Sequence, residues 1–348
     1  MNGRHLGGSS AATVMLVSIA LMSTTCDGGS DVATGSSGAV TPPPLSASSS
    51  PTKLEPRETI RVDFPQDLEI AFDSLWAVSE FLDAVDRIDV ASLELTTIPL
   101  GAGFGPQELE VAAGTVWVTG NKGLVRVQPG TNRVVSHIDG SFKSLASGFG
   151  SLWAGGLDGV TRIDPARSKV IARILPSASG RCSASVGGGA VWMSCGESVK
   201  RIDPATNRIV ATVPHPGRVV VAGDDLWLVR SRDIFEVPDP KDAYTTLDRL
   251  DPTTNRVIPG TRIELIRGAS SVFPRVVGDR ILFPSSNGVG SDVGMLYVFD
   301  PRTGTVVDTL DLSEGKGYGS NSVVIGYGSL WTASGLSDRI RRWLVPLP

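Results

Sequence analysis

A repeat of about 40 residues organises this chain from residue 58 onward. Two clear copies are GSLWAGGLDGVTRIDPARSKVIARI at 150–174 and GGAVWMSCGESVKRIDPATNRIVATV at 188–213. A large apolar residue marks the same place in seven copies: Trp76, Trp117, Trp153, Trp192, Trp227, Leu282 and Trp331. Short strands that recur with a period of about 40 residues are typical of a β-propeller, in which each repeat forms one four-stranded blade. The sequence therefore predicts an all-β fold, a seven-bladed β-propeller of four-stranded antiparallel blades, over residues 58–348.

The two ends of the repeat region indicate how the ring closes. The last copy contains three predicted strands, at 322–327, around Trp331 and at 339–344. The stretch ETIRVDF at 58–64 precedes the first copy and resembles the fourth strands VVSHID and VVDTLDL of other copies. We expect this N-terminal stretch to become the outermost strand of the last blade, because that pairing removes a free sheet edge.

Two recurrent features of the repeat have a structural explanation. The turn between the third and fourth strands reads Asp-Pro-x-Thr-Asn at 203–207 and 251–255. Asp bonds to the nearby backbone, Pro fixes φ and Asn tolerates the left-handed conformation. Successive turn aspartates are a whole blade apart, which argues against a shared calcium site. The tryptophans are expected in the core between adjacent sheets, where a large aromatic side chain fills the space.

Residues 1–25 have the pattern of an export signal peptide. Arg4 and His5 precede the apolar run AATVMLVSIALM at 11–22, which is too short to span a bilayer as a helix. STTC follows, which resembles a bacterial lipoprotein signal in which Cys26 carries the lipid; a plain secretory signal with an incidental cysteine is the alternative. Residues 26–57 form a Gly/Ser/Pro/Thr tract, predicted as a disordered linker. We expect an exported protein, lipid-anchored at the outer face of the cytoplasmic membrane or in the cell envelope.

Cys182 and Cys195 both lie in the fourth repeat copy. A two-residue turn at 188–189 places them directly opposite each other on one face of a hairpin, within reach of a disulfide. An oxidising extracytoplasmic environment favours that bond, and two small buried thiols are the alternative. No His or further Cys stands nearby in the sequence, which argues against a metal site there.

The charge of the chain excludes one class of partner. The net charge is −4, and charges of both signs are dispersed, so no basic stripe exists to follow a phosphate backbone. We expect a monomer that does not bind nucleic acid.

Charged residues recur where the first strand of a blade begins, which in a propeller is the mouth of the central channel. Counting back from the tryptophan position gives Asp67 and Glu69 in blade one, Glu108 and Glu110 in blade two, Arg218 in blade five and Arg275 in blade six. Four carboxylates that oppose two arginines suit a zwitterionic ligand, a cation or a basic peptide. The alternative is that these are solvated rim charges, or that they pair with one another.

Two segments on the same face are longer than their counterparts in other copies. They are residues 230–244 in blade five and 284–294 in blade six. Long loops on a rigid scaffold are where binding residues concentrate.

The pattern GSLWxxxxxxxVxRIDPxTNRVVxxI resembles exported bacterial propellers of the YVTN, NHL and streptogramin-lyase-like group, over residues 58–348. The resemblance implies sensor domains, protein-binding scaffolds and a small number of enzymes. The lyase members work with His and Glu residues and a divalent metal, such as Mg²⁺ or Ca²⁺, near the channel. The repeat region of this chain holds only His137, on a predicted outer strand, and His215, in a predicted connection between blades.

Two functions from different classes follow. We expect a non-catalytic, membrane-anchored propeller that binds a protein, peptide or small-molecule ligand at the channel mouth and needs no cofactor. The alternative is a hydrolase or lyase, streptogramin-lyase-like or lactonase-like, that acts on a small cyclic ester. That enzyme would use His215 and nearby carboxylates as acid and base, with a divalent cation as its cofactor.

Overall fold

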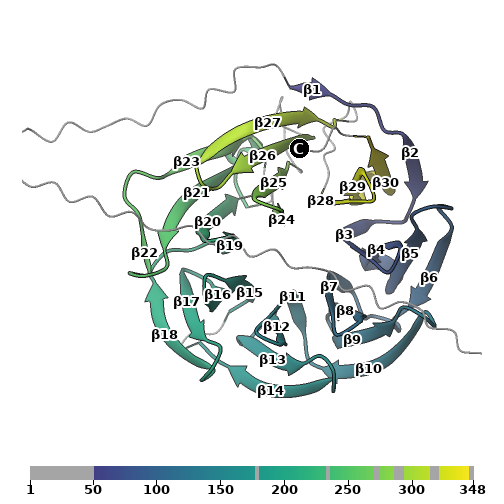
Figure 1. Cartoon of the computed structure of the whole chain (residues 1–348), viewed down its shortest axis with the longest axis horizontal. Coiled ribbons are helices and arrows are strands. Elements are labelled where there is room, and N and C mark those ends of the chain that lie inside the picture. The colour runs from purple at the N-terminus through teal and green to yellow at the C-terminus, as the bar shows by residue number, and fades with distance from the viewer. Residues whose placement is uncertain are drawn as a thin grey trace, which may run out of the picture. The chain divides into compact units, whose positions relative to one another are not determined.

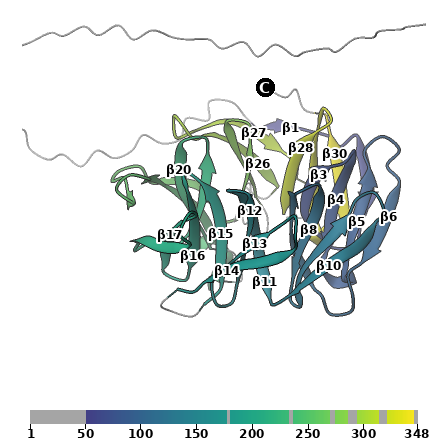
Figure 2. The ribbon, with the colours of Figure 1, turned by 60° about the horizontal axis from the view of Figure 1, so that its bottom comes forward.

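Seven sheets, each built on four antiparallel strands, stand around a central axis (Figure 1). The computed structural model describes residues 51–176, 180–232, 236–269, 274–285, 294–313 and 321–344. The predicted seven-bladed β-propeller is confirmed, and the strands run up and down between the two faces of the ring (Figure 2). Helical structure in these ranges is limited to three 3-10 turns, η1 (Glu80–Leu82), η2 (Pro240–Asp242) and η3 (Gly335–Ser337). None of the helices in them has the length and apolar character needed to cross a bilayer.

Blades one to four follow the repeat copy by copy, from an inner strand at the channel to an outer strand at the rim (Figure 1). Blade one contains β3 (Pro65–Ala71), β4 (Ser74–Ser79), β5 (Ala84–Asp89) and β6 (Leu95–Pro99). Blade two contains β7 (Pro106–Ala112), β8 (Thr115–Gly120), β9 (Gly123–Gln128) and β10 (Arg133–Asp139). Blade three contains β11 (Phe142–Gly148), β12 (Ser151–Gly156), β13 (Val160–Asp164) and β14 (Lys169–Ile174). Blade four contains β15 (Cys182–Gly187), β16 (Ala190–Cys195), β17 (Ser198–Asp203) and β18 (Arg208–Val213).

Blades five to seven depart from the regular pattern. Blade five contains β19 (Arg218–Ala222), β20 (Asp225–Arg232) and β21 (Tyr244–Asp251), and two short strands, β22 (Arg256–Val257) and β23 (Ile263–Arg267), share its outer position. Blade six contains β24 (Arg275–Val277), β25 (Arg280–Pro284), β26 (Met295–Asp300) and β27 (Thr305–Asp311). Blade seven contains β28 (Ser322–Gly326), β29 (Ser329–Ser334) and β30 (Arg339–Trp343).

The N-terminal strand closes the ring, as predicted. β2 (Glu58–Arg61) pairs antiparallel with β30, with Glu58 opposite Arg342. The strand ends at Arg61 rather than at residue 64, where Phe64 adopts a left-handed φ of 48°. β1 (Thr52–Lys53) adds a short parallel strand to the edge of β27. Backbone pairing therefore begins inside the stretch predicted as linker.

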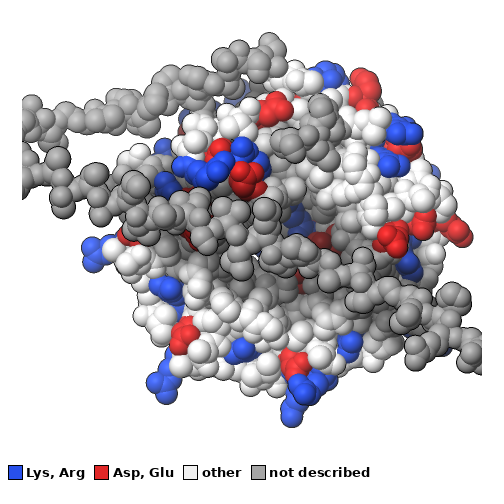
Figure 3. Space-filling model, viewed as in Figure 1, with Lys and Arg blue, Asp and Glu red and all other residues white. Residues whose placement is uncertain are grey.

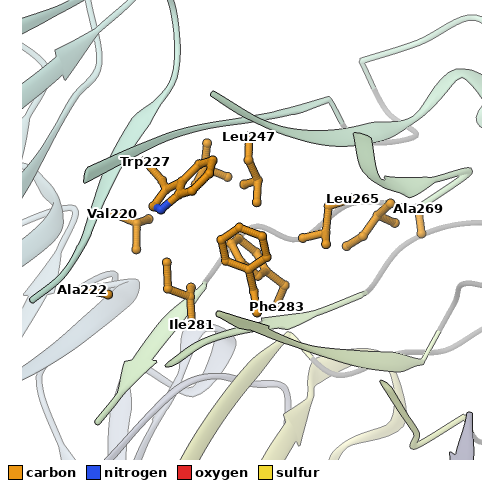
Figure 4. Close-up of a cluster of buried hydrophobic side chains, with 11 residues drawn as sticks. Val220, Ala222, Trp227, Leu247, Leu265, Ala269, Ile281 and Phe283 are labelled. Carbon is orange, nitrogen blue, oxygen red and sulfur yellow. The ribbon is translucent and has the colours of Figure 1, made fainter. Parts of the chain in front are cut away.

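The recurrent tryptophans form the core between blades, and all six of them are at most 2% exposed. Trp76 of blade one, for example, packs with Val116 and Val118 of blade two. Figure 4 shows the equivalent layer between blades five and six, to which Trp227 and Phe283 belong. Trp227 packs edge-on against Phe299, with 5.1 Å between the ring centroids. Burial of these large apolar side chains is the main stabilising force between neighbouring sheets.

An arginine on the third strand joins the tryptophan to the following blade. Arg162 pairs with Trp153 and lies with its guanidinium carbon 4.8 Å from the ring centroid, a cation–π contact. The same guanidinium donates to Pro204 O at 2.6 Å and to Asn207 Oδ1 at 2.8 Å, in the turn of blade four. Equivalent contacts run from Arg87 to Pro129 and Asn132, and from Arg201 to Pro252 and Asn255. In blade six, Leu282 replaces the tryptophan, and Val298 stands opposite it where the other blades have the arginine. This blade therefore lacks both members of the tryptophan–arginine pair.

The hairpin and turn chemistry in blade four matches the local sequence. Cys182 and Cys195 form a disulfide and lie directly opposite each other across the β15–β16 hairpin. In the outer turn, Asp203 accepts the N–H of Ala205 at 3.0 Å and the hydroxyl of Thr206 at 2.7 Å. These hydrogen bonds lower the pKa of Asp203. This exposed carboxylate therefore stabilises its own turn.

Candidate ligand site at the channel mouth

The six predicted site residues lie on the inner strands in two layers. The inner layer consists of the three residues that lie opposite the tryptophan position across the first hairpin of their blade. Glu69 lies opposite Trp76, Glu110 opposite Trp117 and Arg275 opposite Leu282. An outer layer stands two residues closer to the start of the strand and consists of Asp67, Glu108 and Arg218. Contacts between side chains join the two layers into one cluster, which we call the channel cluster.

Arg275 reaches from blade six to two carboxylates of blade one. Its Nη2 lies 2.5 Å from Asp67 Oδ1 and 2.7 Å from Leu68 O, and its Nη1 lies 3.6 Å from Glu69 Oε2. Asp67 is only 2% exposed, whereas the Arg275 side chain is 25% exposed, so the carboxylate is the more desolvated partner. Burial alone lowers the pKa of Arg275, but the attraction of Asp67, Glu69 and the blade-two carboxylates outweighs it, and the net effect raises that pKa. Arg275 therefore stays charged at any relevant pH.

Arg218 reaches from blade five to blade two. Its Nη1 lies 3.4 Å from Glu108 Oε1. Burial is the main effect on Glu108 and raises the pKa of its carboxyl group, although the attraction of Arg218 opposes that rise. Two arginines thus bridge blades that are not neighbours in the ring.

The outer-layer carboxylates also complete the hydrogen bonding of the channel wall. The inner strand of each blade is a sheet edge, and its amides that point to the channel have no ladder partner. Asp67 Oδ2 accepts the N–H of Leu109 at 2.9 Å, and Glu108 Oε2 accepts the N–H of Leu145 at 2.9 Å. The same bond recurs from Ala184 N–H to Ser144 Oγ and from Leu68 N–H to Ser322 Oγ. Asp67 and Glu108 are therefore part of the scaffold.

Glu110 differs from the other three carboxylates. Its Oε1 accepts a hydrogen bond from Ser147 Oγ at 2.8 Å, and no ion pair of Glu110 is found in the described part of the chain. Burial raises the pKa of Glu110 to about 7, and repulsion from Glu69 adds to this rise while the Ser147 hydrogen bond opposes it. Burial also raises the pKa of Glu69, which is partly countered by Arg275.

The channel cluster is deficient in positive charge. It contains four carboxylates and two guanidinium groups, and both guanidinium groups are already engaged. Figure 3 shows red and blue side chains set back within the ring, so charge lies inside the channel as well as on the rim. Glu69 and Glu110 are partly buried, and an ionised carboxylate that loses part of its hydration without a full counter-charge is unfavourable. Proton uptake by Glu110 or the arrival of a cationic group relieves that cost.

The two long segments of the same face are only partly loops. Residues 230–232 extend β20 and pair with β21, with Arg230 opposite Thr246 and Arg232 opposite Tyr244. The expected long loop is wrong for these residues, because the backbone ladder of the hairpin simply continues. Within 284–294, Pro284 ends β25, and residues 286–293 lie outside the described residues.

The two histidines of the repeat region lie where their positions in the repeat predict. His137 is on β10, the outer strand of blade two, with Nε2 3.1 Å from Lys122 O. His215 follows β18, and its backbone N–H donates to Val213 O at 2.8 Å. Among the residues with described placement, the His215 ring has no hydrogen-bond or ion-pair partner. Those residues also contain no group of three or more His, Cys, Asp or Glu side chains that could hold a metal ion.

Ser147 is a site residue that sequence reasoning missed. It lies on β11 of blade three, and its only signal in the sequence is its place near the end of an inner strand beside blade two. The sequence also allows the alternative that the channel carboxylates pair with the arginines, and the structure supports that alternative for Asp67, Glu69 and Glu108.

No protein-family model and no curated protein matches the chain. Solved structures with the same architecture include virginiamycin B lyase from Staphylococcus aureus, at 14% identity and a TM-score of 0.62 over 83% of this chain and 98% of that one. A catalytically inactive histidine-to-alanine variant of that lyase, solved with quinupristin, is equally similar. The Pan2 WD40 domain of Neurospora crassa matches at 9% identity and a TM-score of 0.61, over 86% of this chain and 98% of that one. BamB from Moraxella catarrhalis matches at 11% identity and a TM-score of 0.55, over 82% and 84%. At these identities the likeness establishes a shared β-propeller fold.

Proposed function

We propose that the protein is an exported, membrane-anchored β-propeller that binds a ligand with a cationic group in its channel and does not catalyse a reaction. The observation that carries this proposal is the charge deficit of the channel cluster. Glu110 has a serine hydroxyl as its partner, and Glu69 shares Arg275 with Asp67. An ammonium or guanidinium group beside Glu69 and Glu110 would supply the missing charge.

The rigidity of the outer layer supports a binding role. Asp67 and Glu108 are fixed by arginines and by the edge amides of the next blade. Arg275, which Asp67 holds, also contacts Glu69, so the Glu69 carboxylate is positioned before the ligand arrives and loses little entropy on binding. The ligand classes that fit are a basic peptide or protein segment, a small amine and a zwitterion whose cationic end enters the channel.

Export and anchoring rest on the sequence. The signal pattern of residues 1–25, Cys26 at its end and the Gly/Ser/Pro/Thr tract after it support a propeller tethered at the cell surface. Such a protein meets extracytoplasmic ligands.

A calorimetric titration of the full mature protein tests this binding role. The probes are spermidine, a lysine-containing tripeptide and an arginine-containing tripeptide, with an aspartate-containing tripeptide as the matched negative probe. We expect saturable binding of at least one cationic probe and none of the acidic one. Equal responses to the acidic and cationic peptides would refute a cation-selective channel.

The alternative enzymatic function has one specific observation in its favour. Among the solved propellers of the same fold is a lyase whose histidine-to-alanine variant is inactive. His215 precedes β19, which carries Arg218 of the channel cluster. A panel of lactones, assayed with and without Mg²⁺, tests this function. Metal-dependent turnover that His215→Ala abolishes would replace the binding proposal with the enzymatic one.

A further inference from the structure

Blade five has a feature that is not found in the described residues of the other blades. Its central hairpin extends to Arg232 and Tyr244, and its outer position is divided between β22 and β23. Pro259 and Gly260 fall between these two short strands, and Gly260 has a left-handed φ of 77°. Pro lacks the N–H that an outer strand needs at this point, so the strand is interrupted and resumes as β23 beside the hairpin extension.

A pocket of about 330 Å³ forms where these irregular elements meet. Arg230 lines it from β20, Tyr244 from β21, Lys241 from η2, and Glu264 and Arg267 from β23, with Arg262 just before β23. The opposite side of β23 is anchored in the core, where Leu265 packs near Phe283 (Figure 4). The pocket therefore stands on rigid elements, at a place separate from the channel cluster.

One buried carboxylate positions two of the pocket arginines. The Asp248 side chain is 6% exposed, and its Oδ1 accepts from Arg262 Nε at 3.1 Å. Its Oδ2 accepts from Arg262 Nη2 at 3.2 Å and forms a short contact with Arg230 Nη2. A single negative charge is thus shared between two guanidinium groups, and the remaining donors of both are left over. Arg230 Nε is buried and has no hydrogen-bond partner within the described residues.

The pocket has more donors and positive charge than it can use internally. Four cationic side chains line it, while its carboxylates are Asp242 and Glu264 at the wall and Asp248 beneath. Glu264 is engaged by both Nε and Nη2 of Arg267, at 2.5 and 2.8 Å. In the described part of the chain, the Lys241 ammonium and the Tyr244 hydroxyl form no hydrogen bond. One positive charge and several N–H and O–H donors remain for a ligand.

We propose that this pocket, which we call the blade-five pocket, binds a small ligand through an oxyanion group, a carboxylate or a phosphate. The ligand oxygens accept hydrogen bonds from Lys241, Tyr244 and the guanidinium groups that Asp248 holds in place. This second site is independent of the proposed channel ligand, and it selects the opposite charge.

Titration calorimetry of the full mature protein at constant ionic strength tests the blade-five pocket with inorganic phosphate and with succinate. The test variant is Lys241→Met with Arg262→Gln. The matched control is Lys169→Met with Arg302→Gln, which makes the same change in net charge outside the pocket. We expect wild type and control to bind at least one probe, and the pocket variant to bind it at least about tenfold more weakly, as the loss of a charge-assisted hydrogen bond implies.

The outcomes are distinct. Binding of phosphate alone or succinate alone supports the blade-five pocket and identifies the oxyanion. Absence of saturable binding to wild type by both probes overturns the proposal. Equal weakening in the pocket variant and the control also overturns it, because a general charge effect then explains the result. Circular dichroism of each variant verifies that the propeller is folded.

Discussion

Arg275 forms an ion pair with the buried Asp67 between blades six and one, with 2.5 Å between Nη2 and Oδ1. Asp67 also accepts the N–H of Leu109 in blade two and the hydroxyl of Ser322 in blade seven. One carboxylate therefore links four of the seven blades at the channel wall. The same charges that stabilise the ring define the electrostatic character of the site.

Asp67→Asn should lower the free energy of unfolding by about 3 kcal/mol, because it leaves the partly buried Arg275 beside a neutral amide with only Glu69 as its counter-charge. Urea denaturation of wild type and variant measures this loss. Asp203→Asn, in an exposed turn, is the matched control and should cost much less, because its side chain stays in contact with water. A loss from Asp67→Asn no larger than that of the control would contradict the proposed role of the pair.

Stability should fall between about pH 4.5 and pH 7 in part because of Glu110. The folded-state pKa of Glu110 is raised from 4.5 to about 7, so the folded protein binds a proton that the unfolded chain has already released. This contribution is complete below pH 4.5 and is lost as the pH rises through 7; the raised pKa values of Glu69 and Glu108 act in the same direction. Urea midpoints at pH 5 and pH 8 should differ less for Glu110→Gln than for wild type. The exposed-site variant Glu94→Gln should behave as wild type, and an unchanged difference in Glu110→Gln would contradict the assignment.

Deletion of residues 58–64 should destabilise the propeller by more than about 3 kcal/mol, because it removes the β2 ladder and exposes apolar surface. Val62 is 3% exposed and lies in one core cluster with Trp331. Deletion of residues 27–50 is the control and should leave the melting temperature unchanged, since β1 begins at Thr52. Equal melting temperatures for the two deletions would show that β2 does not close the ring.

The repeat made the fold predictable, because strand alternation, turn residues and the tryptophan position recur with the same spacing. The repeat predicts only a left-handed backbone conformation for the Asn of the outer turn. The structure shows that the Asn207 side chain also accepts a hydrogen bond from Arg162 of the preceding blade. That contact joins residues 45 positions apart. Only the joint recurrence of the arginine and the turn asparagine in the repeat could have indicated it.

The channel cluster was predictable in composition but not in connectivity. Counting along the repeat identifies Glu69 and Arg275 as channel residues. It does not identify their ion-pair partners, because a long side chain in the channel can reach several charged groups. The choice depends on backbone positions to within an ångström, which repeat spacing does not specify. The long segment 230–244 is predicted to carry binding residues, and Arg230, Lys241 and Tyr244 of the blade-five pocket lie there. The contribution of β23 is not predictable from the repeat, because Pro259 interrupts the outer strand and thereby breaks the pattern.

Cys26→Ser should release the protein from the membrane fraction into the medium, because attachment through acyl chains needs the cysteine sulfur. Fractionation followed by immunoblotting measures the shift. A variant that stays in the membrane fraction and requires detergent for extraction would contradict lipid anchoring at Cys26.

Titration calorimetry of the Glu69→Gln, Glu110→Gln double variant tests whether the channel binds a cation. The ligand is the cationic probe that wild type binds most tightly. Both substitutions keep side-chain size and remove only the charge that the ligand would meet. We expect affinity to fall about tenfold or more, as the loss of charge-assisted hydrogen bonds implies, while Asp203→Asn binds as wild type does. Unchanged affinity in the double variant, or no cationic probe that binds wild type, would contradict a cation site in the channel.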